Sequence, residues 1–266
     1  QQLYNTVDTI VVGKYVGPDA LAAVGSTFSM VFFINAIIMG LSMGISVIIS
    51  QYFGAKKLDE MRKAFATSLL FVGAFSVLLT AFALICVKPI LVLLDSPIET
   101  IAMSEVYLYT VFAGIVFIFA YNVFAAILRA VGDSKTPLYF LIVSTVLNIF
   151  LDLWFVLSFG MGVFGVAFAT LLAQALSAVL CVIYTFVRKP ELRLKKSDFT
   201  FDKKMLSMML KFGIPTAIQQ ALVSVGMMAI QGLVNSYGYE FMAGYAAAGK
   251  IDSFAMMPLM NLKKKK

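Results

Sequence analysis

Four polar residues in otherwise apolar surroundings are the candidates for chemistry in this sequence: Asp8, Asn148, Asp152 and Thr170. Asn148 and Asp152 are four positions apart, so a helix would place them on one face. Asp8 lies in a second apolar stretch, and Thr170 lies at mid-depth of the run that follows Asp152. Two carboxylates, an amide oxygen and a hydroxyl are hard oxygen ligands, which suit a proton or a small hard cation better than a soft metal. We expect these four residues to form one cation or proton site.

Burial of a carboxylate in such a stretch has a cost that needs an explanation. A charged side chain at the centre of a bilayer costs at least about 2.5 to 3.5 kcal/mol on insertion scales. Asp152 must therefore face a partner or a cavity if its run crosses a membrane. The alternative is that each polar residue joins helices by hydrogen bonds, or that Thr170 bonds to its own helix. The four residues taken together favour the functional interpretation.

The composition predicts an all-α, polytopic membrane protein. The chain is 61% hydrophobic and 13% charged, whereas soluble domains are about half apolar and about a quarter charged. The apolar runs exceed the ~20 residues that a transmembrane helix needs, and they lack the alternating polarity of barrel strands. The six long runs are Ala20 to Ala55, Ala64 to Val87, Val106 to Leu128, Thr136 to Phe159, Gly162 to Val187 and Phe212 to Tyr239.

Two shorter apolar segments lie at the ends of the chain. Gln1 to Gly13 resembles the second half of a helix, and Ala243 to Leu262 resembles a helix that is cut short. We therefore interpret the sequence as a fragment with a non-native lysine tail. The expected organisation is a first lobe (1–187), a basic linker (188–204) that is a solvated connector, the start of a second lobe (205–262) and the tail (263–266).

The distribution of basic residues predicts the orientation in the membrane. Outside the tail, 14 Lys and Arg fall in alternate loops on one side and three on the other, at Lys14, Lys88 and Lys250. Cytoplasmic loops carry the excess of Lys and Arg, so the N-terminal side is expected in the cytoplasm. The net charge of +7 is thus a topology signal, and no nucleic-acid partner is expected.

An internal repeat, together with the lack of histidine and of a disulfide or metal-binding pattern, narrows the possible functions. Residues 219–230 resemble residues 1–12, and residues 237–249 resemble residues 16–28, which predicts parallel repeats. Gly213 and Pro215 are placed to break or bend the last long helix. Cys86 and Cys181 indicate neither a disulfide framework nor a metal site, and the sequence has no His. We expect no enzyme activity and no cofactor.

Four motifs resemble the multidrug and toxic compound extrusion (MATE) family of transporters. They are LYNTVDTIVVGKYVGPDALAAVGS, SQYFGAKKLDEMRKA, ILRAVGDSKTPLYF and NIFLDLWFV. The resemblance runs in order along nearly the whole chain. The resemblance implies twelve helices in two six-helix lobes, of which this chain supplies the first lobe and part of the second. It also implies exchange of Na⁺ or H⁺ for cationic or amphipathic organic compounds, by a monomer in the prokaryotic cytoplasmic membrane.

The resemblance assigns residues as well. In the DinF-like branch the cation site of the first lobe falls on Asp8, Asn148, Asp152 and Thr170. The substrate cavity is expected to include Gln1, Tyr4, Tyr107 and Asn122. The NorM-like branch instead uses a glutamate eight residues after the proline of the seventh helix, where this chain has Val223, so that pattern is not met.

Three rival functions are weighed against this one. A lipid-linked oligosaccharide flippase of the same superfamily needs basic residues in its cavity, and Lys250 alone lies within an apolar run. An intramembrane aspartyl protease needs Gly-x-Gly-Asp, whereas the contexts here are NTVDT and IFLDL. The third alternative is an inactive transporter fragment, since one lobe and a part cannot close a two-lobe cavity.

Overall fold

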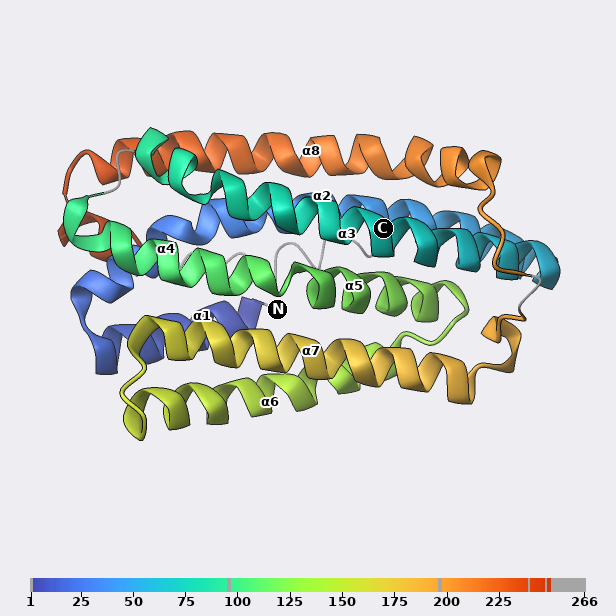
Figure 1. The fold of residues 1–266 in the computed structure, drawn as a ribbon, viewed down its shortest axis with the longest axis horizontal. Coiled ribbons are helices and arrows are strands. Elements are labelled where there is room, and N and C mark those ends of the chain that lie inside the picture. Colours follow the sequence, from blue (N-terminus) through green and yellow to red (C-terminus); the bar gives the residue numbers. More distant parts are fainter. Residues whose placement is uncertain (1, 95–96, 196–197, 239, 247, 250–266) are drawn as a thin grey trace.

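The computed structural model describes residues 2–94, 97–195, 198–238, 240–246 and 248–249. Within this part of the chain the regular elements are helices that run lengthwise and side by side (Figure 1). They are α1 (Gln2–Val11), the π-helix η1 (Val12–Val16), α2 (Pro18–Gly54), α3 (Leu58–Leu93), α4 (Ile98–Ala113), α5 (Ile115–Ala130), α6 (Lys135–Leu157), α7 (Gly162–Arg188), the 3₁₀ turn η2 (Pro190–Leu192) and α8 (Lys203–Asn235).

The predicted all-α membrane architecture is confirmed. In the described residues, five helices are long and apolar enough to cross a membrane, and the bent pair of α4 and α5 makes a sixth span. Each of the six long apolar runs falls on one of these spans. Most of the terminal segment 243–262 lies outside the described residues, although 240–246 and 248–249 are helical.

The span predicted between Val106 and Leu128 is bent rather than straight. It begins earlier, at Ile98, and its two halves meet at Gly114 with an angle of 46°. A side chain at position 114 would lie 3.1 Å from the Val111 carbonyl oxygen and 3.3 Å from Leu171 of α7. The glycine therefore permits both the change of direction and the close approach of α7.

The helix α2 is central and packs against α3, α4, α5 and α8. Its contact with α8 has almost no side chains between the backbones. A Cβ atom at Gly44 would lie 2.2 Å from the Met209 carbonyl oxygen and 2.6 Å from Gly213 N. Small residues of this kind are what allows helices to approach closely in a membrane.

The prediction that Gly213 and Pro215 break the helix is wrong, and a bend there stays a prediction. The helix α8 begins at Lys203, well before the expected start, and continues through Pro215 to Asn235. Gly213 does not break it. A side chain at Gly213 would lie 3.2 Å from the Gly40 carbonyl oxygen, so this glycine serves packing against α2.

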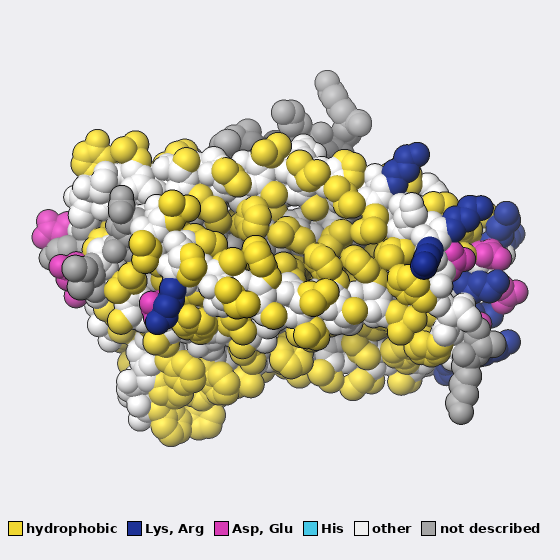
Figure 2. Space-filling view, turned by 45° about the horizontal axis from the view of Figure 1, so that its top comes forward, with side chains coloured by type: hydrophobic (Ala, Val, Ile, Leu, Met, Phe, Trp, Pro, Cys, Tyr) yellow, Lys and Arg dark blue, Asp and Glu magenta, His cyan; other side chains and the backbone are white. Residues whose placement is uncertain are grey.

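Charge and apolar surface are separated along the molecule. Figure 2 shows hydrophobic side chains over the long sides, and Lys and Arg gathered at the end where α3 and α8 begin. We name this the basic end. Large apolar side chains such as Leu93 and Ile85 are 80% and 75% exposed. In a membrane these faces contact lipid, which is consistent with helices that are apolar nearly all round.

The linker 188–204 is packed more closely than a solvated connector would be. Leu192 in η2 is fully buried, and Arg62 of α3 donates a hydrogen bond of 3.2 Å to the Glu191 carbonyl oxygen. The backbone N–H of Asp202 donates to the hydroxyl of Thr67, also on α3, at 3.3 Å. Much of the linker is thus held against the first lobe, which the expectation of a plain solvated segment missed.

The two copies of the predicted repeat share one local feature. Gly17 (φ +133°) precedes α2, and Gly238 (φ +89°) precedes the helical residues 240–246. Both glycines have a positive φ, which residues with a side chain rarely adopt. The alignment of 237–249 with 16–28 pairs these two glycines. The repeat over whole lobes stays a prediction.

Candidate functional site

The four residues selected from the sequence lie together where α1, α6 and α7 meet. The hydroxyl of Thr170 on α7 donates to Asp8 Oδ2 on α1 at 3.0 Å. The side-chain amide of Asn148 on α6 donates to Thr170 Oγ1 at 3.1 Å and, more weakly, to Asp152 Oδ1 at 3.4 Å. Asp8, Asn148 and Asp152 are fully buried. The helical spacing of Asn148 and Asp152 gives both residues the same face, as expected.

The site lies nearer the end opposite the basic one than the sequence suggested. Asp152 is the eighteenth of the 23 residues of α6, and Thr170 is the ninth of the 27 residues of α7. The predicted mid-depth position of Thr170 is therefore displaced by about a turn and a half of helix. Thr170 is also the ninth residue of the predicted run Gly162 to Val187, so the helix bounds were right and the depth assigned to Thr170 was wrong.

One oxygen atom of the site is available for a ligand. Asn148 Oδ1 is buried and accepts no hydrogen bond from the described residues. The side chains of Asp8 and Asp152 lie within hydrogen-bonding reach of each other, so the two carboxyl groups can share a proton. Asp8 is close enough for its charge to act on Asp152. Two carboxylates in low dielectric repel each other, so neutralisation by a proton or a small cation lowers the free energy of the cluster. Carboxylate, amide and hydroxyl oxygens fit either occupant.

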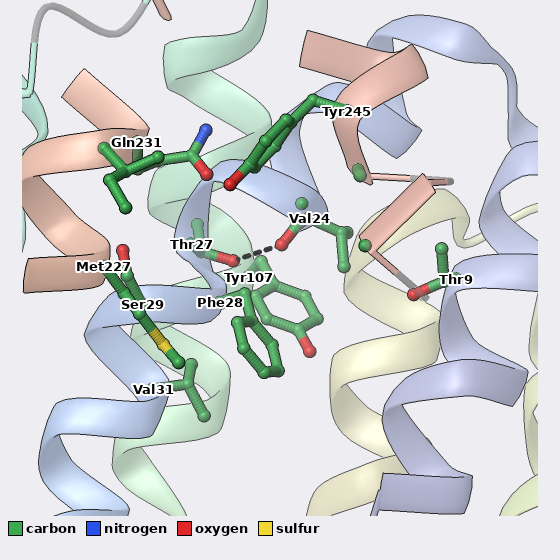
Figure 3. A pocket seen from close by; sticks show the side chains of 14 residues that line it. Thr9, Val24, Thr27, Phe28, Ser29, Val31, Tyr107, Met227, Gln231 and Tyr245 are labelled. Atoms are coloured by element: carbon green, nitrogen blue, oxygen red, sulfur yellow. Dashed lines mark hydrogen bonds between the residues drawn. The ribbon is translucent and has the colours of Figure 1, made fainter. Parts of the chain in front are cut away.

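A cavity of about 240 Å³ lies between α1, α2 and α4 on one side and α8 with Tyr245, Ala246 and Gly249 on the other. Figure 3 shows the rings of Phe28 and Tyr107 side by side, with Met227 on one flank and Gln231 and Tyr245 beyond them. The lining comes from α1, α2, α4, α8 and residues 245–249, and it contains no Lys or Arg among the described residues. Such a lining of aromatic and aliphatic groups, with one thioether, one amide and several hydroxyls, suits a flat amphipathic compound.

Of the four residues predicted to line the substrate cavity, the structure places Tyr107 in the lining and Asn122 outside it. Tyr107 is 5% exposed and lines the cavity. Asn122 is on α5, where its amide donates to the Ile118 carbonyl oxygen of its own helix, and it is not part of the lining. Gln1 lies outside the described residues, and Tyr4 belongs to α1. The roles of all four in substrate binding stay predictions.

Sequence reasoning missed most of the lining. Thr9, Phe28, Met227 and Gln231 carry no signal that separates them from neighbours of the same types. Thr9 alone had an indirect signal, since it follows Asp8. Its position beside the cavity brings the carboxylate cluster and the cavity close together. Tyr107 does the same, because it lines the cavity and lies within electrostatic range of Asp8 and Asp152.

Comparison with known proteins assigns the fold to a family. A family model described as MatE matches residues 1–154, more than half of the chain. The chain belongs to the MATE family. It is 34% identical to the probable multidrug resistance protein YoeA of Bacillus subtilis over 98% of its length, and 28% identical to the probable multidrug resistance protein NorM of Thermotoga maritima. It covers 58% and 57% of those two relatives, so it spans little more than half their length.

Solved structures of MATE proteins share the arrangement of these helices. An inward-facing multidrug resistance MATE transporter superposes with a TM-score of 0.92 at 28% identity, over 97% of this chain and 59% of its own. The MATE multidrug transporter DinF-BH, solved in complex with a dye, superposes with a TM-score of 0.89 at 29% identity, over 97% of this chain and 58% of its own. The chain is therefore a multi-pass membrane protein whose relatives are transporters rather than enzymes.

Proposed function

We propose that the protein carrying this chain is a secondary active multidrug efflux transporter, which exchanges Na⁺ or H⁺ for cationic or amphipathic organic compounds. One observation carries the proposal: the buried cluster of Asp8, Asn148, Asp152 and Thr170, in which the two carboxyl groups lie within hydrogen-bonding reach of each other and Asn148 Oδ1 accepts no hydrogen bond from the described residues. The names of the relatives support the multidrug part, and the complex of the neighbour DinF-BH with a dye supports a dye as a substrate.

Coupling follows from the position of the cluster beside the cavity. Without a bound ion the cluster carries negative charge, which attracts an organic cation into the cavity next to Tyr107. A proton or Na⁺ bound at the cluster removes that charge and weakens the attraction. The coupling ion and the organic cation are attracted by the same negative charge, so binding of one lowers the affinity of the protein for the other. Exchange of the two requires such mutual weakening of binding. The residues Tyr107 and Thr9 are the physical link between the two sites.

The alternatives are less well supported. A flippase for lipid-linked oligosaccharides needs cations that hold a pyrophosphate, and the described lining of the cavity contains no Lys or Arg. Intramembrane proteolysis has no support from the relatives, which are named multidrug resistance proteins. An inactive fragment is the remaining alternative, because the chain spans 58% of the length of YoeA.

The test is dye efflux from bacterial cells that express the protein. Expression is expected to lower the accumulation of a lipophilic cationic dye, and collapse of both the proton and the sodium gradient should restore it. Efflux that persists without either gradient and requires ATP would refute the antiporter. If this chain inserts in the membrane but exports no dye, while a version extended to the length of YoeA does export it, the chain is an inactive fragment.

We also propose that the basic end is cytoplasmic, that the membrane is the prokaryotic cytoplasmic membrane, and that the protein acts as a monomer. The charge asymmetry of the helix ends supports the first statement.

A further inference from the structure

Polar side chains continue past the carboxylate cluster along the contact between α6 and α7, toward the basic end. Ser144 lies one helical turn before Asn148 on α6, and its hydroxyl forms a hydrogen bond with the hydroxyl of Ser177 on α7. Both serines are fully buried. The contact between these helices is thus polar for at least two turns beyond Asp152.

Gln174 lies between the two places where α7 contacts α6 through hydrogen bonds. It is four residues after Thr170, which bonds to Asn148, and three residues before Ser177, which bonds to Ser144. Residues at these spacings share one face of a helix. Gln174 is 6% exposed, and its Oε1 accepts no hydrogen bond from the described residues. A buried amide oxygen without a donor is rare in folded proteins and calls for a ligand or an ordered water.

An aromatic pair follows the serines, one turn further along α6 and two turns further along α7. The rings of Phe140 on α6 and Tyr184 on α7 meet edge to face, with centroids 5.7 Å apart. They lie between the serine pair and the basic end along both helices. Gln174, Ser144 and Ser177 therefore lie along one stretch of the contact between α6 and α7, which runs from the carboxylate cluster to the aromatic pair.

We propose that Gln174 Oε1, with the hydroxyls of Ser144 and Ser177, forms a second binding station for a small alkali cation, adjacent to the Asp152 site. This inference rests on the proposed function, since the station lies on a path between the carboxylate cluster and the basic end. All of its ligands are neutral oxygen atoms. Amide and hydroxyl oxygens bind Na⁺ but do not hold a proton near neutral pH. Asn148 Oδ1, which also accepts no hydrogen bond from the described residues, lies between the two sites and can serve either.

The station gives the protein a means to distinguish its coupling ions. A proton is held at the carboxylate cluster alone, whereas Na⁺ can occupy both positions and pass from one to the other. If Gln174 serves helix packing instead, its amide makes no difference to ion binding, and the protein binds Na⁺ at the carboxylate cluster or not at all.

The experiment measures binding of ²²Na⁺ to the purified protein, with choline as the counter-cation and K⁺ as a competitor. Trp154, the single tryptophan of the chain, is two residues after Asp152 on α6 and reports binding through its fluorescence. The informative variant is Gln174→Met, which keeps the size of the side chain and removes the amide oxygen. Thr185→Val is the matched control, because this buried hydroxyl of α7 donates to the Cys181 carbonyl oxygen of its own helix.

We expect the wild-type protein to bind two Na⁺ per chain, Gln174→Met to bind one, and Thr185→Val to bind two. Gln174→Glu keeps an oxygen atom at the station and adds a negative charge. This variant should therefore bind two Na⁺ per chain, with a lower Kd for Na⁺ than the wild type. This variant also provides the test if Gln174→Met does not fold. Equal Na⁺ binding by the wild type and Gln174→Met overturns the station and leaves the proposed function standing. A wild-type protein that binds no Na⁺ also overturns the station, while proton-coupled dye efflux then decides the proposed function separately.

Discussion

The hydroxyl of Thr170 and the carboxylate of Asp8 form a hydrogen bond of 3.0 Å between residues that are 162 positions apart in the chain. This bond ties α1 to α7, and Asn148 ties α7 to α6. The cluster therefore exists only when all three helices are packed. A bound ion would stabilise that packing by mass action, which links ion occupancy to the arrangement of the helices.

Replacement of Asp152 by Asn tests the carboxylate cluster directly. The Asp152→Asn protein should insert and fold, because it removes a charge whose burial costs free energy. Gradient-driven dye efflux should nevertheless be abolished. An amide cannot take up a proton and attracts a cation less strongly. Asp8→Asn should behave in the same way.

Expression level and dye efflux must be measured together in these variants. Asp19→Asn is the matched control, because this carboxylate lies in the first turn of α2, outside the cluster. If Asp152 only joins helices, Asp152→Asn should express poorly and the surviving protein should keep its ion dependence. A well-expressed Asp152→Asn protein with unchanged coupled efflux would exclude the site.

Removal of the Thr170 hydroxyl should have a milder effect. Thr170→Val keeps the shape of the side chain but removes the donor to Asp8 and the acceptor for Asn148. A lost hydrogen bond to a charged group costs about 1.5 to 3 kcal/mol. We expect the ion concentration for half-maximal efflux to rise by about tenfold while maximal efflux is retained. An unchanged half-maximal concentration would show that Thr170 takes no part in ion binding.

The sequence predicted the spans and the cluster for physical reasons that act locally. Lipid requires long apolar helices, so each of the six runs was visible from residue types alone. Asp8 and Asp152 could be identified as site residues because burial of a carboxylate in an apolar run costs free energy, which a partner or a bound ion must offset. The spacing of Asn148 and Asp152 then predicted one shared face without knowledge of the rest of the fold.

Features that depend on packing between distant segments were not predictable in this way. Phe28 and Met227 line the cavity, but their types are common in this chain and nothing local shows which face of a helix is lined. The bend at Gly114 depends on the approach of Leu171 from another helix. Pro215 suggested a break, yet α8 continues through it. The close contact between α2 and α8 is a tertiary feature that the sequence neighbourhood of Pro215 does not encode.

The ion pair at the basic end predicts a pH dependence of stability. Lys189 Nζ lies 3.0 Å from Asp133 Oδ2, and the hydroxyls of Tyr184 and Thr136 donate to the same oxygen. Partial burial acts to raise the pKa of Asp133, but the hydrogen bonds from Lys189 and Thr136 outweigh it and lower that pKa below 3.8. Burial likewise acts to lower the pKa of Lys189, and the Asp133 partner raises it above 10.5.

The sign of each contribution follows from these directions. The Asp133 contribution is present above its unfolded pKa and is lost as pH falls through the lower folded value. The Lys189 contribution is present below its unfolded pKa and is lost as pH rises through the higher folded value. Asp133→Asn should therefore lower stability near neutral pH by about 1 kcal/mol. The difference from wild type should vanish in strong acid, as measured by thermal unfolding in detergent. A difference that is constant from neutral pH to strong acid would contradict the ion pair.

The contact between α2 and α8 predicts that position 44 tolerates no side chain. The Cβ of Gly44→Ala would meet backbone atoms of Met209 and Gly213 at 2.2 and 2.6 Å, so the helices must separate. Overpacking of this kind costs about 1 to 3 kcal/mol. Gly54→Ala is the matched control, because a Cβ at the last residue of α2 meets nothing within 4 Å. Equal unfolding temperatures of the two variants would argue against the close α2–α8 contact.

The separation of charge along the molecule predicts which loops face the cytoplasm. Lys57 and Lys195 lie at the basic end, after α2 and in the linker, and Asp19 lies in the first turn of α2 at the opposite end. Helices that cross a membrane place these positions on opposite sides. The excess of Lys and Arg assigns the basic end to the cytoplasm.

Single cysteines introduced at these three positions test the assignment in intact cells with a thiol reagent that does not cross membranes. The background protein needs Cys86→Ser, since this cysteine is partly exposed, whereas Cys181 is buried. Asp19→Cys should react from outside, and Lys57→Cys and Lys195→Cys should react only after the cells are opened. If Asp19→Cys reacts only after the cells are opened, and the other two variants react in intact cells, the orientation is the opposite of the one proposed. Reaction of Lys57→Cys and Lys195→Cys from opposite sides would mean that the two lie at different ends, and would contradict the helix arrangement itself.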